Sequence, residues 1–288
     1  MVLVHGLAPQ GKDDPRLGQA ARLLARAGFR VAVPTIPGLT RLRLRPEDAE
    51  PVVAAIQALA DAEPRGNIAL IGVSVGAGPA FLAAADPRVA HRVGVVLSLG
   101  GYASTVELLR YFLTGAYAYG GISGGVAPRP EAARLFLRVN LDLLRSPEDR
   151  RALDGWLAEA RSTPPARLST EGEAVIRLVE NRDPGQVDAL VRALPPDLQQ
   201  LLARLSPEHM AARIPARLLL VHGRGDPAVP FTESLRLADA ARGKAGTRVV
   251  VVGAVAHVEP GDGGPGWGGT APELWQLWSL LLDFLSSA

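Results

Sequence analysis

Residues 72–76 have the sequence Gly-Val-Ser-Val-Gly, which places Ser74 between two glycines. The segment follows an apolar run at 67–71 and precedes a stretch of small residues at 77–85 that favours a helix. In a sharp strand-to-helix turn, glycines avoid clashes with neighbouring backbone and the serine hydroxyl is lifted out of the sheet. We therefore predict that Ser74 is a nucleophile for acyl transfer. The alternative is a plain glycine-rich turn.

A serine hydroxyl is a weak nucleophile near neutral pH, so it requires a base and a carboxylate that orients the base. His257 follows the apolar run 247–252, and Asp226 follows the apolar run 217–221. Because sites in parallel sheets form at the carboxyl edge of the strands, both residues can meet the serine there. We predict His257 as the base and Asp226 as the orienting acid. The alternatives are an ordinary loop histidine and an Asx-turn residue.

An oxyanion hole requires two hydrogen-bond donors close to the nucleophile. The backbone N–H of Val75, directly after the serine, is the first candidate. The second is the backbone N–H of Leu7, in the loop that follows the apolar run 2–4 through His5 and Gly6.

The remaining histidines predict no further chemistry. His5 and His222 directly end predicted strands, where a histidine more often bonds the backbone, and His91 and His209 lie at predicted surface junctions. The chain has no cysteine and no His-Glu-x-x-His pair, so we predict no metal site. It also lacks a Gly-x-Gly-x-x-Gly segment after a strand and a Walker A sequence, so we predict no cofactor.

Composition narrows the class of protein. The chain has 288 residues, 48% of them hydrophobic, and a net charge of +2, which indicates a globular protein. The basic run 41–45 is interpreted as a solvated loop, and nucleic acid is not an expected partner. No apolar stretch is long enough to span a membrane and no signal peptide is visible, so the expected location is cytoplasmic.

Strand and helix signals alternate in the two outer parts of the sequence. The predicted strands are 2–4, 29–33, 67–71, 92–99, 217–221 and 247–252, and the predicted helices are 17–27, 46–60, 77–85, 232–242 and 271–286. This order is typical of an α/β fold with a mostly parallel central sheet and helices on both faces. In the last helix, the expected apolar face comprises Leu274, Leu277, Trp278, Leu281 and Leu285.

Strand signals stop between residues 101 and 213. Segments 131–144, 147–160, 172–179, 186–194 and 197–205 favour helices, and the glycine-rich stretch 115–130 favours a loop. We therefore predict a core formed by 1–100 and 214–288, with an all-helical cap inserted at 101–213.

These residues resemble the α/β-hydrolase family. The resemblance rests on His5-Gly6, the segment 72–76, Asp226 and His257, and on the order Ser, Asp, His along the chain. It implies the α/β-hydrolase fold and supports the roles given above. Members usually carry two strands before the His-Gly loop, whereas this sequence carries one, which is compatible with a shortened sheet or a missing N-terminal segment.

The expected activity is hydrolysis of carboxylic esters through an acyl-enzyme. The cap supplies an apolar and aromatic set that suits an acyl chain or aryl group, or that forms the cap's own core. This set comprises Leu108, Tyr111, Phe112, Tyr117, Tyr119, Phe136 and Trp156.

Three alternatives to the esterase remain. They are a peptidase or aminopeptidase, in which Glu107, Glu131 or Glu173 binds the substrate amine, a thioesterase, and a non-catalytic ligand-binding member of the family.

Overall fold

The computed structural model describes residues 1–159, 163–243, 246–253, 255–256, 259–260 and 267–288, with backbone alone for 255–256, 259–260 and 267–270. By its internal contacts the chain divides into two compact units. The core unit comprises Met1–Arg41, Arg45–Ala103 and Ser206–Ala288. The insertion unit comprises Leu42–Leu44 and Ser104–Leu205.

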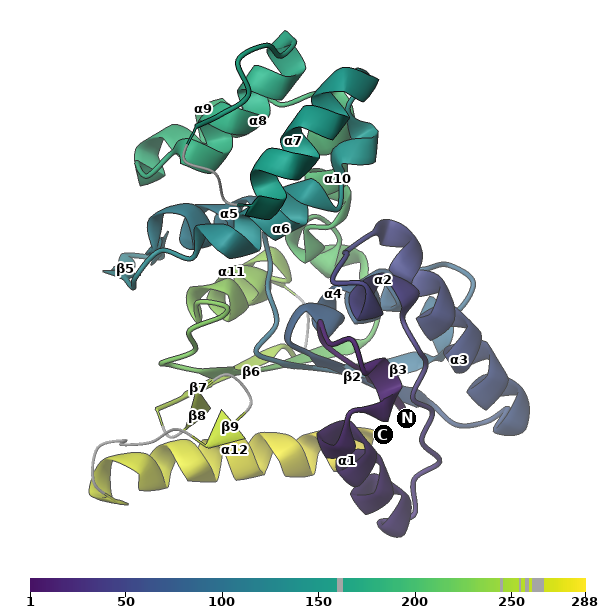
Figure 1. Ribbon diagram of the computed structural model, residues 1–288. Helices are drawn as coiled ribbons and strands as arrows, with labels where there is room; N and C mark the ends of the chain where they lie inside the picture. The colour runs from purple at the N-terminus through teal and green to yellow at the C-terminus, as the bar shows by residue number, and fades with distance from the viewer. Residues whose placement is uncertain (160–162, 244–245, 254, 257–258, 261–266) are drawn as a thin grey trace. The chain divides into compact units, whose positions relative to one another are not determined.

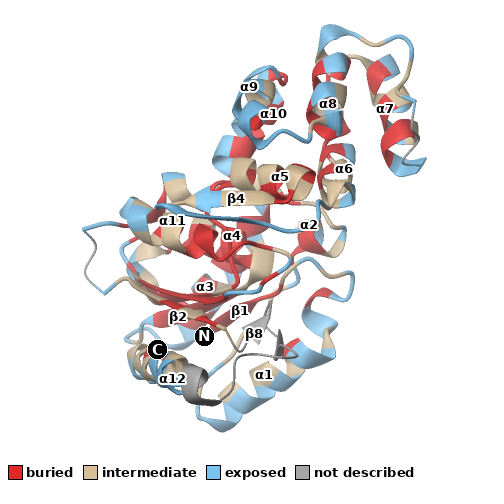
Figure 2. Cartoon of the chain, turned by 90° about the vertical axis from the view of Figure 1, so that its left-hand side faces the viewer, coloured by how far each residue is buried: buried red, intermediate tan, exposed pale blue. Residues whose placement is uncertain are grey.

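The core unit is built on a five-stranded sheet whose paired strands are all parallel (Figure 1). The strand order is β1 (Val2–Val4), β2 (Ile68–Val73), β3 (Val93–Leu99), β6 (Arg217–Gly223) and β7 (Arg248–Val252). The first four of these strands are buried along most of their length (Figure 2), as expected for a parallel sheet covered on both faces. In the edge strand β7, only Val250 and Val252 are buried. The predicted α/β class is confirmed.

Segment 29–33 was predicted as a strand, and this prediction is wrong in extent. The segment runs beside β1, where Leu3 N–H donates to Ala32 O and Ala32 N–H donates to Met1 O, both at 2.9 Å. The pairing amounts to one isolated bridge between Val2 and Ala32. A three-residue strand offers few partners, and Pro34 lacks the N–H that would extend the ladder.

Helices cover both faces of the sheet (Figure 1). One face packs against α1 (Pro15–Arg26) and α12 (Trp267–Ser287), through strand side chains such as Ile71, Leu97 and Leu219. The other face contacts α3 (Glu50–Ala62), α4 (Ala77–Ala84) and α11 (Thr232–Ala240). Successive strand residues therefore point to opposite, equally apolar layers.

The face that helix α12 turns to the sheet matches the predicted one only in part. Leu280 and Phe284 are fully buried and Leu277 and Leu281 partly so, whereas Trp278 is 56% exposed. Leu274 and Leu285, also expected inside, are exposed. The helix is apolar on more than one side, so periodicity alone could not select the buried stripe.

A cluster of ion pairs fixes the rotation of α12. Arg217, at the start of β6, bonds both carboxylate oxygens of Asp283 at 2.9 and 2.6 Å, and Arg248 of β7 adds a bond at 3.0 Å. The bond from Arg217 lowers the pKa of Asp283, with Arg248 contributing. Asp283 must therefore face the sheet ends, which places Leu280 and Phe284 inside.

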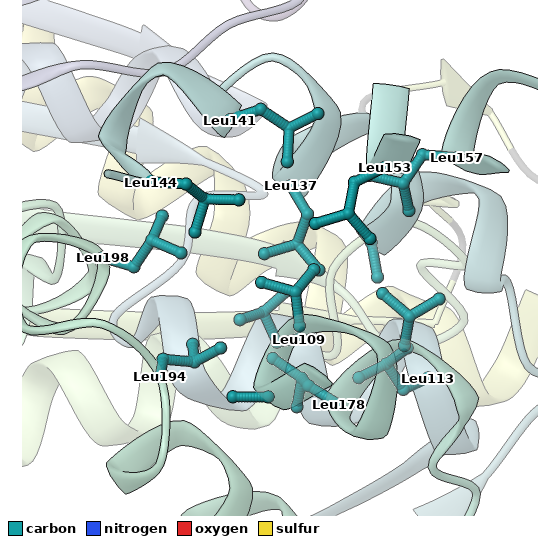
Figure 3. Close-up of a cluster of buried hydrophobic side chains, with 14 of the residues drawn as sticks. Leu109, Leu113, Leu137, Leu141, Leu144, Leu153, Leu157, Leu178, Leu194 and Leu198 are labelled. Atoms are coloured by element: carbon teal, nitrogen blue, oxygen red, sulfur yellow. The ribbon is translucent and has the colours of Figure 1, made fainter. Parts of the chain in front are cut away.

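The insertion unit contains six α-helices and a hairpin among its described residues. They are α5 (Thr105–Thr114), β4 (Ala116–Tyr119), β5 (Ile122–Gly125), α6 (Pro130–Arg138), α7 (Pro147–Glu159), α8 (Thr170–Glu180), α9 (Val187–Arg192) and α10 (Pro196–Arg204). Its core is a leucine-rich cluster, whose leucines are drawn in Figure 3. Trp156 is a member of the same cluster.

The hairpin corrects the prediction of an all-helical insertion with a loop at 115–130. Strands β4 and β5 pair antiparallel around Gly120 and Gly121, which have φ values of 57° and 80°. Two adjacent residues with positive φ form the tight turn that suits a two-residue hairpin, and glycine adopts it without strain. The alternating Ala-Tyr-Ala-Tyr before the glycine pair was the available signal.

The short segment Leu42–Leu44 belongs to the insertion unit although it is distant in sequence. Leu44 is 7% exposed, and Arg43 donates to Asp142 at 2.9 Å. The interpretation of residues 41–45 as a solvated loop is therefore wrong at these positions.

Candidate active site

Ser74 lies in the sharp turn between β2 and α4. Its φ is 53°, in the left-handed region that side chains other than glycine rarely adopt. A Cβ at position 72 would lie 2.6 Å from Ala77 Cα, and a Cβ at position 76 would overlap the His5 carbonyl oxygen. The two glycines are thus required by close backbone, and the strain is concentrated on the serine between them.

The loop after β1 lies directly against this turn. A methyl group at Gly6 would be 3.3 Å from Ser74 Cβ and 3.9 Å from Ser74 Oγ. The structure therefore brings together two segments that are far apart in sequence, the His5-Gly6-Leu7 loop and the turn that carries Ser74 and Val75.

His5 fixes the orientation of the peptide that joins Gly6 to Leu7. It is 2% exposed, and its Nε2 accepts a hydrogen bond from Ile36 N–H at 3.1 Å. Nδ1 must then carry the ring proton, and it donates to Gly6 O at 2.8 Å. Because the carbonyl and N–H of a trans peptide point in opposite directions, Leu7 N–H points away from the imidazole.

Asp226 lies in the loop that follows β6. Because the paired strands are parallel, this loop is at the same edge of the sheet as the turn after β2. The side chain is buried, with the residue 4% exposed, and its Oδ1 accepts from Ala228 N–H at 2.7 Å and Val229 N–H at 3.0 Å. Oδ1 thus closes an Asx-type turn, and Oδ2 lies 3.5 Å from His222 Nε2.

His257, the predicted base, lies outside the described residues, and its position relative to Ser74 and Asp226 stays a prediction. Before it, β7 ends at Val252, and Gly253 N–H donates to Glu273 at 2.6 Å. Two-residue strands β8 (Val255–Ala256) and β9 (Glu259–Pro260) then pair antiparallel.

Tyr102 supports the helix that follows Ser74, and sequence reasoning did not identify it. It is fully buried beside Gly78 of α4, where an added Cβ would overlap its hydroxyl. Burial raises the pKa of Tyr102 well above its usual range, with smaller contributions from Asp48 and Glu233. The phenol therefore stays protonated. The close approach of Tyr102 to Gly78 is visible only in the structure.

The predicted substrate-binding side chains have different surroundings. Trp156 belongs to the leucine-rich core of the insertion unit, and Phe112 and Phe136 pack against that core. Leu108 and Tyr111 are buried, and Tyr111 contacts the ring of Tyr117 with centroids 6.2 Å apart. Tyr119 is half-buried at the end of β4. For Trp156, Phe112 and Phe136, the role in the unit's own core is the one observed.

Of the three carboxylates considered for a substrate amine, Glu107 forms an ion pair with Arg110 at 3.2 Å. Glu131 and Glu173 are exposed. Within the described residues, no group of three or more metal-ligating side chains comes together. The helices in the same part of the chain include none that is both long and apolar enough to cross a membrane.

Comparison with known proteins identifies the family. A model of the alpha/beta hydrolase family matches residues 1–263. No curated protein matches the sequence.

Three solved structures illustrate the structural likeness. An esterase from Pyrococcus furiosus is 14% identical with a TM-score of 0.51, covering 99% of this chain and 80% of that one. A structure from work on the metagenome-derived lipolytic enzymes LipS and LipT is 14% identical with a TM-score of 0.50, covering 99% and 92%. An acylaminoacyl peptidase is 17% identical with a TM-score of 0.50, covering 99% and 36%. At these identities the likeness shows the fold alone. Since the family model spans most of its length, the chain belongs to the alpha/beta hydrolase family.

Proposed function

We propose that this protein is a serine hydrolase that cleaves carboxylic esters through an acyl-enzyme on Ser74. The observation that carries the proposal is the φ of 53° at Ser74 between two sterically required glycines. A non-glycine residue in such a conformation costs about 1–3 kcal/mol, and strain of this kind concentrates at functional sites. A plain turn would have no reason to keep a serine in this conformation.

In the proposed reaction, His257 removes the proton of Ser74 Oγ as the oxygen attacks the ester carbonyl carbon. The backbone N–H groups of Leu7 and Val75 bind the oxyanion. His257 then protonates the leaving alcohol, and water hydrolyses the acyl-enzyme by the reverse proton transfers. Asp226 holds His257 in the required tautomer and stabilises its cation. The fixed Gly6–Leu7 peptide and the burial of Asp226 support these assignments.

The insertion unit is proposed as the cap that selects the substrate, and the substrate as a small ester with an apolar acyl or aryl group. The composition of the unit supports this, since its side chains include Leu108, Tyr111 and Tyr117, none of which belongs to the leucine-rich cluster as described. Peptidase and thioesterase reactions would use the same catalytic groups. The ion pair of Glu107 with Arg110 gives the aminopeptidase alternative less support.

The test is hydrolysis of p-nitrophenyl esters from acetate to palmitate by the wild type and by Ser74→Ala. We expect measurable turnover with an optimum at one chain length. In Ser74→Ala, kcat should fall at least about 10⁴-fold, because the residual rate comes from binding and the oxyanion hole alone. A folded wild type without turnover on any ester would contradict the ester assignment, and peptide and thioester substrates would then be tested.

A further inference from the structure

His222 is a buried titratable residue that the proposed reaction does not use. It lies near the end of β6, four residues before Asp226, and is 1% exposed. Its ring has three polar neighbours. Nδ1 is 2.7 Å from Ser234 Oγ, and Nε2 is 3.0 Å from Val229 O and 3.5 Å from Asp226 Oδ2. These contacts link the strand, the first turn of α11 and the Asp226 loop.

The proton on this ring is assigned by its neighbours. A carbonyl oxygen can only accept, so Nε2 carries the proton and donates to Val229 O. In the neutral ring Nδ1 is then an acceptor, and the Ser234 hydroxyl donates to it.

Val229 is held from both sides. Its N–H donates to Asp226 Oδ1 at 3.0 Å, and its carbonyl accepts from His222 at 3.0 Å. A displacement of Val229 would therefore remove one of the two backbone hydrogen bonds to Asp226 Oδ1, the other coming from Ala228 N–H. His222 thus restrains the loop that holds the Asp226 carboxylate.

We propose that His222 is a positioning residue, which fixes the carboxylate of Asp226 through the backbone of Val229 so that Asp226 can orient the base. This inference rests on the proposed serine-hydrolase function. The proposal predicts that catalysis requires a hydrogen-bond donor at the position of His222 Nε2, and that a side chain other than imidazole can supply it.

Two substitutions separate the two sides of the ring. The amide of glutamine reaches the position of Nε2 and can still donate to Val229 O, whereas the shorter amide of asparagine reaches only the position of Nδ1. In His222→Asn we expect kcat to fall about 10- to 100-fold with KM within about twofold, and in His222→Gln we expect kcat within about threefold of the wild type. His91→Asn, at an exposed histidine, is the matched control and should be unchanged.

A double-mutant cycle distinguishes positioning from general destabilisation. If His222 acts through Asp226, then adding His222→Asn to Asp226→Asn should reduce kcat by less than about twofold. An equal loss in both backgrounds, or a His222→Gln variant as impaired as His222→Asn, would overturn the proposal. If His222→Asn does not fold, Ser234→Ala in the same two backgrounds supplies the cycle, with a smaller loss that must again vanish beside Asp226→Asn.

Failure of the inference can be told apart from failure of the proposed function. A wild type whose ester turnover does not depend on Ser74 contradicts the function itself. A wild type with Ser74-dependent turnover and no coupling between positions 222 and 226 contradicts only the role of His222.

Discussion

The tetrapeptide Leu-Val-His-Gly occurs twice, at 3–6 and at 220–223, and its two histidines are held in opposite tautomers. Both side chains are buried near the carboxyl end of a parallel strand. His5 carries its proton on Nδ1 and donates to Gly6 O, whereas His222 carries its proton on Nε2 and donates to Val229 O. Each ring thereby fixes a loop, one beside Ser74 and one around Asp226.

The difference between the two regions comes from their partners and not from the tetrapeptide. Ile36 N–H can only donate, which makes His5 Nε2 an acceptor. Val229 O can only accept, which makes His222 Nε2 a donor. The tetrapeptide therefore specifies a buried histidine at a strand end. Backbone groups outside it determine which ring nitrogen donates a hydrogen bond to the loop.

The largest effect on stability is expected for Gly76→Ala, beside Ser74, in comparison with Gly225→Ala, beside Asp226. An added methyl in Gly76→Ala overlaps the His5 carbonyl, so the β1 loop and the Ser74 turn must separate. We expect the free energy of unfolding to fall by about 3 kcal/mol and kcat to fall at least about 100-fold. Denaturant unfolding and ester turnover measure the two effects.

Gly225→Ala in the Asp226 loop is the matched control. No described heavy atom lies within 4 Å of the added methyl, so stability should change by less than about 0.5 kcal/mol. Equal stability losses in the two variants would show that the contact between the β1 loop and the Ser74 turn is not what requires glycine at 76.

The next effect tests the tautomer of His5 directly. In His5→Asn the amide can still donate to Gly6 O, whereas in His5→Gln it reaches Ile36 N–H and leaves Gly6 O unbound. We expect kcat to fall about 10²-fold in His5→Gln, the typical cost of one oxyanion donor, and about tenfold less in His5→Asn. Steady-state kinetics on a p-nitrophenyl ester measures the ratio.

The preferred replacement is thus expected to reverse between the two histidines. Asparagine should be the better substitute at 5 and glutamine the better one at 222. The same rank order at both positions would contradict the opposite tautomers.

The smallest effect concerns the opposite end of β6. The pKa of Asp283 is lowered, so its carboxylate stabilises the fold above about pH 4, and this contribution is lost as the pH falls through the lowered pKa. Because the charges are partly exposed, we expect Asp283→Asn to cost about 1 kcal/mol, or about 2–4 °C in Tm, at neutral pH. Thermal unfolding as a function of pH measures this.

The kcat of Asp283→Asn should stay at the wild-type value, because the residue anchors the start of β6 and not its catalytic end. A loss of kcat comparable to that in His222→Asn would mean that anchoring of β6, and not the hydrogen bonds of Val229 with His222 and Asp226, explains both variants.

The sequence predicted what depends on local pattern. Apolar runs located all five strands of the sheet, and Gly-x-Ser-x-Gly located the turn at Ser74. Features that depend on distant partners were missed. The rotation of α12 is set by Arg217 of β6 and Arg248 of β7. Leu44 is buried because its segment belongs to the insertion unit.

For the candidate site, the types of residue were predictable but their restraints were not. His5 and His222 were expected to bond the backbone, and both do. Which ring nitrogen donates depends on Ile36 N–H for His5 and on Val229 O for His222, and both groups lie outside the tetrapeptide. The hairpin at 116–125 was missed for a different reason, because a glycine-rich stretch also fits a loop.

The most direct test of the central claim is the site of covalent reaction with a fluorophosphonate, which phosphonylates an activated serine and loses fluoride. Intact-mass analysis followed by peptide mapping should find one adduct per chain, on Ser74, and none on Ser74→Ala. An adduct on another residue, or undiminished labelling of Ser74→Ala, would contradict the assignment of Ser74 as the nucleophile.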